Sequence, residues 1–216
     1  SKQGISRGHR VITALLWSSA ALTINPAAAN PGDASAYDIV IKNGTIIDGS
    51  GLARYRGDVA IAEGHIVAVG DVGSGKAART IDATGLVVSP GFINIHSHAE
   101  PDAVSTAVNM LTQGVTTGII NADGSGSVDI ATELSKYAAN GLAENIGAYV
   151  GFNAIWSDAM GDRDLRPTEA QIAGMRAVLE NNLAAGAWGV ASGLDYRPAY
   201  YAKPEEVVAI LSAAAS

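Results

Sequence analysis

The chain has no cysteine among its 216 residues. This absence excludes disulfide bonds and thiolate metal ligands, so any metal ion must be held by histidine and carboxylate side chains. Histidine is also scarce, with four in the chain, yet two of them, His96 and His98, are one residue apart. This pair is therefore the first candidate for a metal site.

Positive charge is in short supply as well. The chain carries 14 lysines and arginines against 21 aspartates and glutamates, which gives a formal charge of −7. No stretch forms the basic stripe that neutralises a phosphate backbone, so we expect no nucleic-acid partner. The 48% of hydrophobic residues and 16% of charged residues are typical of a globular protein with a buried core.

Long apolar runs are missing too. The apolar segment at residues 11–22, VITALLWSSAAL, is shorter than the roughly 20 residues that a membrane-spanning helix needs. Basic residues precede it and small residues follow it, a pattern typical of a secretory signal peptide. We expect a signal peptide at 1–29, a linker at 30–36, a periplasmic or secreted location and no membrane anchoring after cleavage. The alternative is an irregular N-terminus.

Residues 37–90 consist of short apolar segments separated by turns. The pairs Asn43-Gly44 and Glu63-Gly64 each lie between alternating apolar runs, which predicts a hairpin turn at both places. We therefore expect a small β-domain over this range.

Strand and helix patterns then alternate four times. The strands are expected at 92–95, 115–120, 145–154 and 188–194, and the helices at 103–114, 127–141, 168–186 and 203–215. Such alternation predicts βα units and a parallel sheet, whose ligand-binding residues lie at the carboxyl ends of the strands.

His96 and His98 lie at the end of the first of these strands. Alternate residues of a strand point to the same side, so the two imidazoles can share one ion, and neutral imidazole is a good zinc ligand. Glu100 and Asp102 lie just beyond, where a carboxylate could orient a histidine or touch a substrate. The alternative is that the histidines only cap a buried strand.

Several segments resemble the amidohydrolase superfamily. NGTIIDG and GHIVAVG match its β-domain, and VVSPGFINIHSH is similar to its P-G-x-(I/V)-D-x-H-x-H junction, with Asn94 in place of the aspartate. QGVTTGIINADG resembles its second barrel strand. GAWGVASGLDYRPAYYAKPEE resembles the G-A-x-G-(L/V)-S-(S/T)-G-L-x-Y-x-P segment of the N-acyl-D-amino-acid deacylase (D-aminoacylase) branch. The resemblance spans about residues 37–215.

The resemblance implies an α/β fold, the N-terminal part of a TIM-like (β/α)8 metallo-dependent hydrolase barrel preceded by the small β-domain. Residues 91–216 would hold the first half of that barrel. It also implies one or two zinc ions, and a zinc-activated water that cleaves the amide bond of an N-acyl-D-amino acid or a related small amide. The alternatives are a cyclic-amide or dipeptide amidohydrolase, or an inactive truncated half-barrel.

The resemblance also assigns site residues. Asp123 stands where the branch has a cysteine ligand, so His96, His98 and Asp123 are the expected metal ligands; an Asp-Gly turn without a metal role is the alternative. The expected substrate-binding residues are Glu100, Ser192, Tyr196 and Arg197.

The planar guanidinium of Arg197 suits a substrate carboxylate, although a surface loop explains this residue as well. GFNAIW at 151–156 lacks the histidine and the arginine of the branch's Gly-His-x-x-(L/I)-R stretch, which leaves the exact substrate open. The general-base aspartate and further histidine ligands are expected beyond Ser216, so the chain alone is expected to be inactive.

Overall fold

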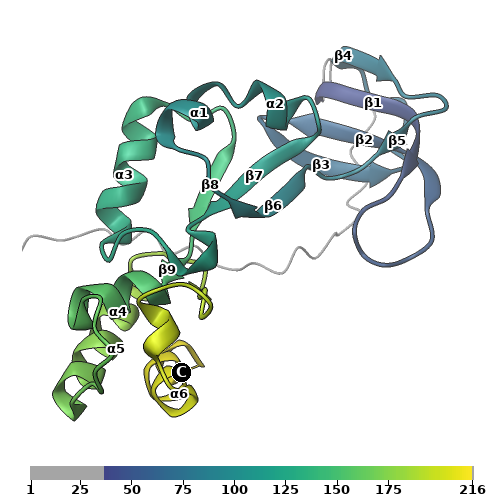
Figure 1. The fold of residues 1–216 in the computed structure, drawn as a ribbon. Coiled ribbons are helices and arrows are strands. Elements are labelled where there is room, and N and C mark those ends of the chain that lie inside the picture. The colour runs from purple at the N-terminus through teal and green to yellow at the C-terminus, as the bar shows by residue number, and fades with distance from the viewer. Residues whose placement is uncertain (1–36, 216) are drawn as a thin grey trace, which may run out of the picture. The chain divides into compact units, whose positions relative to one another are not determined.

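The computed structural model describes residues 37–215 (Figure 1). The chain divides into two compact units at the junction of Pro90 and Gly91, and each unit is described by itself. The predicted signal peptide at 1–29 and the linker at 30–36 lie outside the described residues and stay predictions. Within the described residues, no helix has the length and apolar character needed to cross a membrane.

The first unit is a single five-stranded sheet. Its strands are β1 (Tyr37–Ile46), β2 (Tyr55–Ala62), β3 (His65–Gly70), β4 (Ala77–Asp82) and β5 (Val87–Val88). The order is β3-β2-β1-β4, with β5 also paired to β1. β2 is antiparallel to both of its neighbours, whereas β4 and β5 run parallel to β1. Tyr37, Val40, Ala60 and Val72 form its small core, which confirms the predicted β-domain.

The predicted hairpin turn at Glu63-Gly64 is confirmed. It joins the antiparallel strands β2 and β3, and its two residues have φ angles of 51° and 75°. Two successive positive φ values are those of the tight turns that match the twist of a hairpin.

The predicted hairpin turn at Asn43-Gly44 is wrong, because both residues lie inside β1. The register of β1 against β2 shifts between Ile41 and Gly44, and Asn43 has a φ of 63°. The backbone N–H of Asn43 donates to Asp58 Oδ1 at 2.8 Å and its side-chain amide donates to Asp82 Oδ1 at 3.1 Å. These hydrogen bonds across neighbouring strands hold a β-bulge where sequence alone suggests a turn.

The second unit alternates strands with helices. Its strands are β6 (Phe92–Ser97), β7 (Val115–Ile120), β8 (Asn145–Ala148), β9 (Val150–Gly151) and β10 (Val190–Ala191). Its helices are α1 (Pro101–Thr106), α2 (Val108–Leu111), α3 (Ile130–Asn140), α4 (Phe152–Met160), α5 (Glu169–Ala184) and α6 (Pro204–Leu211). β6, β7 and β8 pair in parallel in chain order, and β10 pairs in parallel with β9. The parallel α/β arrangement is thus as predicted.

Helix and sheet bury a common apolar core in this unit. Ile120 on β7 and Ala148 on β8 pack with side chains of α3, α4, α5 and α6, among them Trp156, Leu179 and Ile210. Figure 1 shows α4, α5 and α6 grouped at the C-terminal end of the chain. Thr168 caps the N-terminus of α5: its side chain accepts from the N–H of Gln171, and the side-chain oxygen of Gln171 accepts from the N–H of Thr168.

Three predicted element boundaries are wrong. The helix expected at 103–114 breaks at Ala107, which has a φ of 37°, and forms α1 and α2 instead. The strand expected at 145–154 ends at Gly151, because the apolar residues after it are buried as the helix α4. A short apolar run is compatible with a buried strand or a buried helix, and only tertiary packing decides between them. The strand expected at 188–194 is reduced to the two residues of β10.

Glu144, directly before β8, is a buried carboxyl group of the second unit. It is 5% exposed, and its Oε2 atom has no hydrogen-bond partner among the described residues. Burial raises the pKa of this carboxyl group. A raised pKa means that the folded state favours the protonated form, so its contribution to stability is present in acid and is lost as the pH rises through the folded-state pKa.

We expect Glu144→Gln to stabilise the protein by about 1 kcal/mol near neutral pH, because the amide is uncharged as the protonated acid is. Thermal unfolding of both proteins from about pH 4 to about pH 8 measures this, and the gain should shrink toward the acid end. Glu180→Gln is the matched control, since the side chain of Glu180 is 53% exposed. A gain that is equal at every pH would contradict the role given to Glu144.

Candidate metal centre

The two histidines of the His-x-His pair converge at the end of β6. His96 is in the strand and His98 follows its last residue, and their Nε2 atoms are 3.2 Å apart. The pairing of β6 with β7 is irregular between Asn94 and Ser97, and the Asn94 side chain accepts a hydrogen bond from the N–H of His96 at 3.1 Å. Such local irregularity in a strand re-aims side chains, and here it accompanies two imidazoles that face one another.

Asp123 approaches both histidines from the next strand. It lies in a short 3-10 turn, Ala122–Gly124, directly after β7, and it has a φ of 62° and a ψ of 15°. Its Oδ2 atom is 3.4 Å from His96 Nε2 and 3.2 Å from His98 Nε2. The sequence-predicted ligands are therefore brought together by the carboxyl ends of two adjacent parallel strands.

Asn121 fixes the start of this turn. It has a φ of 65°, and its side-chain amide donates to Glu133 Oε2 at 2.7 Å and to the carbonyl of Tyr149 at 3.2 Å. These partners come from α3 and from the residue between β8 and β9. The turn that presents Asp123 is therefore tied to the scaffold on two sides, and its left-handed backbone is maintained by those contacts.

The geometry of the three donor atoms suits zinc. In a tetrahedral site with bonds of about 2.0–2.1 Å, neighbouring ligand atoms are about 3.3 Å apart. The three separations in this cluster are 3.2, 3.2 and 3.4 Å, so the atoms lie as three corners of such a site would. His96, His98 and Asp123 could therefore hold a metal ion. Their side chains are 58%, 61% and 38% exposed, which leaves the cluster open on one side.

The residues predicted to bind substrate occupy two places. Ser192 directly follows β10, and a Cβ atom at the adjacent Gly193 would lie 2.6 Å from the carbonyl oxygen of Asp123, so this segment adjoins the metal-ligand turn. Arg197 is exposed, and its Cζ atom is 5.6 Å from the centre of the Tyr201 ring, a cation–π contact. Tyr196 lies between them in the same segment and is 55% exposed.

Glu100 is less closely joined to the cluster. It is the N-cap residue of α1, two positions after His98, and its side chain does not cap the helix. None of the hydrogen bonds or ion pairs found in residues 37–215 links it to His96, His98 or Asp123.

Two asparagines near the cluster were missed by the sequence analysis. Asn121 holds the Asp123 turn, and Asn153 hydrogen-bonds the backbone of Gly193. The available signal was a polar amide at the end of an expected strand, directly after 115–120 for Asn121 and within 145–154 for Asn153, but the partners of both amides are distant in sequence and could not be inferred from it.

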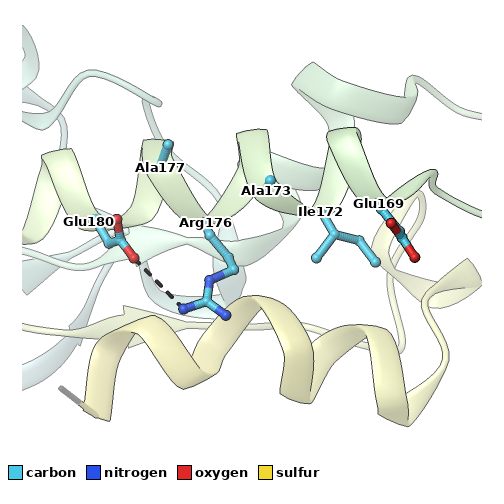
Figure 2. A pocket seen from close by; sticks show the side chains of 6 residues that line it. All are labelled: Glu169, Ile172, Ala173, Arg176, Ala177 and Glu180. Carbon is cyan, nitrogen blue, oxygen red and sulfur yellow. Dashed lines mark ion pairs between the residues drawn. The ribbon is translucent and has the colours of Figure 1, made fainter.

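A hollow of about 450 Å³ lies elsewhere, on one face of α5 (Figure 2). Its lining consists of Glu169, Ile172, Ala173, Arg176, Ala177 and Glu180. Figure 2 shows the Arg176 side chain extending from α5 toward the neighbouring helix. Its Nη1 atom donates to the carbonyl of Ala209 on α6 at 3.5 Å, and its Nη2 atom is 3.9 Å from Oε1 of Glu180, which is also on α5. None of these residues belongs to the candidate metal centre.

A family model and several known proteins are similar to this chain in sequence. Residues 24–95 match the family model described as the urease alpha-subunit, N-terminal domain. The chain is 29% identical over 203 residues to D-aminoacylase of Alcaligenes xylosoxydans xylosoxydans, covering 82% of this chain and 42% of that protein. It is 32% identical over 200 residues to N-acyl-D-aspartate deacylase of the same organism, covering 79% of this chain and 39% of that protein.

A solved deacylase structure is also similar to this chain in its fold. The N-acyl-D-glutamate deacylase of Bordetella bronchiseptica, in complex with zinc and a phosphonate inhibitor that mimics the tetrahedral intermediate, superimposes with a TM-score of 0.72 at 30% identity. The match covers 83% of this chain and 43% of that one.

The α/β fold with a small β-domain is similar to that of this deacylase structure. Over most of its length the chain is similar in sequence to D-aminoacylase and to the N-acyl-D-aspartate and N-acyl-D-glutamate deacylases. It spans about two fifths of the length of these relatives.

We expect His96→Ala to weaken zinc or cobalt binding at least about tenfold, because one of three converging donors is removed. Metal content after dialysis and competition with a chelator measure the loss. His65→Ala is the matched control, since His65 is an exposed histidine of the first unit. Full metal occupancy in the His96 variant would reject the site.

Asp123→Ala should also lower the metal affinity, because the carboxylate supplies the third donor. Asp123→Asn is expected to fall between the wild type and the alanine variant, since an amide oxygen is a weaker ligand without charge. Unchanged affinity in both variants would leave Asp123 as a turn residue.

Proposed function

We propose that this chain forms part of a metal-dependent amidohydrolase that cleaves the amide bond of N-acyl-D-amino acids. The observation that carries the proposal is the convergence of His96, His98 and Asp123 in a zinc-compatible geometry at the ends of adjacent parallel strands. Support comes from the relatives, whose names specify D-aminoacylase and N-acyl-D-aspartate deacylase activity.

The residues of this chain would act first as metal ligands. His96 and His98 bind through their Nε2 atoms, which requires neutral imidazole, and Asp123 binds through a carboxylate oxygen. When bound, zinc lowers the pKa of a coordinated water toward neutrality and polarises the amide carbonyl. One or two ions are compatible with the proposal.

Other residues of the chain would bind and orient the substrate. Ser192 and Tyr196 lie in the segment next to the Asp123 turn, where a small molecule held near the metal ligands would be within reach. Arg197 presents a planar guanidinium, which suits the carboxylate that every N-acyl amino acid carries. Glu100 is two positions after His98, and we include it among the residues that would bind the substrate.

We also propose a TIM-like (β/α)8 barrel as the complete architecture of the second unit. The parallel pairing of β6, β7 and β8 in chain order supports this. The pattern of residues 1–29 supports a periplasmic or secreted location.

Substrate preference tests the proposed reaction. The complete enzyme of which this chain is proposed to form part, loaded with zinc, should hydrolyse N-acetyl-D-amino acids, as measured by release of the free amine, and should act much less on the L-enantiomers. Cyclic amides and dipeptides are the comparison substrates. Faster turnover of either would favour the alternative amidohydrolases, and no turnover of any amide would favour an inactive protein.

Arg197→Ala is expected to raise KM for N-acetyl-D-amino acids at least about tenfold, because a charge-assisted contact with the carboxylate is lost. The matched control is a substrate, the same N-acetyl-D-amino acid as its primary amide, which carries no carboxylate. Its KM should be unaffected by the substitution. An equal rise for both compounds would contradict carboxylate binding by Arg197.

A further inference from the structure

Asn153 makes an unusual pair of hydrogen bonds with a single residue. It is the second residue of α4 and is 9% exposed. Its Nδ2 donates to the carbonyl of Gly193 at 2.8 Å, and its Oδ1 accepts from the N–H of the same glycine at 3.0 Å. Both bonds are buried. Both polar ends of one side chain are therefore occupied by the two backbone polar groups of one residue, an arrangement called here the Asn153 clamp.

The Asn153 clamp connects two strand ends. Asn153 comes directly after β9 and Phe152, and Gly193 comes directly after β10 and Ser192. β9 and β10 are paired in parallel, so these ends are at the same edge. The carbonyl of Gly193 also accepts from the N–H of Tyr196 at 3.0 Å. The clamp thus holds the turn that contains both Ser192 and Tyr196.

The turn held by the clamp packs directly on the turn that carries Asp123. A Cβ atom at Gly124 would collide with Asn153 Oδ1 and would lie 2.9 Å from the Cα of Ser192. A Cβ atom at Gly193 would lie 2.6 Å from the carbonyl oxygen of Asp123. Both contacts are too close for any side chain larger than glycine, so Asn153, the Ser192–Gly193 backbone and the Asp123–Gly124 backbone form one closely packed unit.

We propose that Asn153 is a positioning residue that sets the distance between the metal-ligand turn and the substrate-side segment. Its side chain donates one hydrogen bond to Gly193 and accepts one from it, and none of its bonds in residues 37–215 goes to His96, His98 or Asp123. It acts through Gly193 on Ser192 and Tyr196, and through Gly124 on Asp123. The assignment of Ser192 and Tyr196 to the substrate rests on the proposed function, whereas the coupling to Asp123 rests on geometry alone.

Asparagine is suited to this position because the clamp needs one donor and one acceptor at fixed spacing. Aspartate supplies an acceptor for the N–H of Gly193 but places a second oxygen against its carbonyl, where no hydrogen bond forms. Alanine leaves both backbone groups of Gly193 without this partner in a buried place. Asn153→Asp therefore removes one hydrogen bond of the clamp, and Asn153→Ala removes both.

The experiment compares Asn153→Asp and Asn153→Ala with Asn182→Ala. Asn182 is a matched control, because it is 5% exposed and its side chain also bonds only backbone, accepting from Ile130 and donating to Val128 and Val178. Three quantities are measured on the intact protein: the visible absorption spectrum and affinity of bound Co²⁺, the kinetic constants for N-acetyl-D-amino acids, and the unfolding temperature.

Both Asn153 variants should weaken Co²⁺ binding severalfold, change the intensity of its absorption bands and raise KM at least about tenfold. Asn182→Ala should lower the unfolding temperature but leave the cobalt spectrum and KM as in the wild type. If the Asn153 variants behave like Asn182→Ala, with a loss of stability alone, Asn153 is only structural and the proposal is overturned.

Gly193→Ala provides an independent variant should the Asn153 variants not fold. Its added methyl group would lie 2.6 Å from the carbonyl oxygen of Asp123 and 2.6 Å from Cδ2 of the Tyr196 ring, so both must shift while the Asn153 side chain stays intact, and the same change in the cobalt spectrum is expected. An unaltered spectrum in this variant would count against the coupling.

Failure of the proposed function is distinguishable from failure of this inference. A wild-type protein that binds Co²⁺ but hydrolyses no N-acyl-D-amino acid would reject the substrate, while the cobalt spectra would still decide the role of Asn153. Normal hydrolysis with spectra and KM unchanged in the Asn153 variants would reject the positioning role alone. No Co²⁺ binding by the wild type would reject the metal centre and this inference together.

Discussion

The left-handed turn after β7 is the constraint on which the candidate metal centre depends. Asn121, Asp123 and Gly124 have φ angles of 65°, 62° and 78°. A left-handed conformation is unfavourable for residues other than glycine, although asparagine and aspartate adopt it more readily than most, so contacts with the surroundings stabilise this turn. Asn121 receives that support from Glu133 and Tyr149, and a Cβ atom at Gly124 would collide with Asn153. With the backbone so directed, the Asp123 carboxylate reaches two histidines that belong to another strand.

Parallel topology supplies the rest of the arrangement. β6 and β7 belong to one parallel sheet and β9 and β10 to another, and in each sheet the carboxyl ends lie at one edge, close to a residue of the centre or its support. The residues involved are distant in sequence, yet each comes within a few positions of a strand end. Short turns at these ends let the scaffold fix the side chains, because there is little loop length over which a position can vary. This is why buried amides, rather than long loops, set the geometry of the centre.

Sequence patterns predicted the parts of this protein that local chemistry determines. The spacing of His96 and His98 was sufficient to predict a shared ligand side, since the period of a strand is two residues. Asp123 could be named only through the family resemblance, because its distance from the histidines depends on the pairing of β6 with β7. The bulge at Asn43 and the helix that begins at Phe152 were mispredicted for the same reason. In both cases contacts with other elements, rather than the local sequence, select the backbone conformation.

The Asn153 clamp lies in a stretch whose sequence differs from that of the deacylase branch. GFNAIW departs from the histidine- and arginine-containing stretch of the deacylase branch, and Phe152 and Trp156 are instead fully buried in the core. The polar side chain left in this stretch at the strand end is Asn153, and it bonds backbone rather than solvent. A buried amide with both ends satisfied favours one arrangement of its neighbours over others, because any displacement leaves polar groups unpaired. The segment that carries Ser192 is thereby held against the turn that carries Asp123.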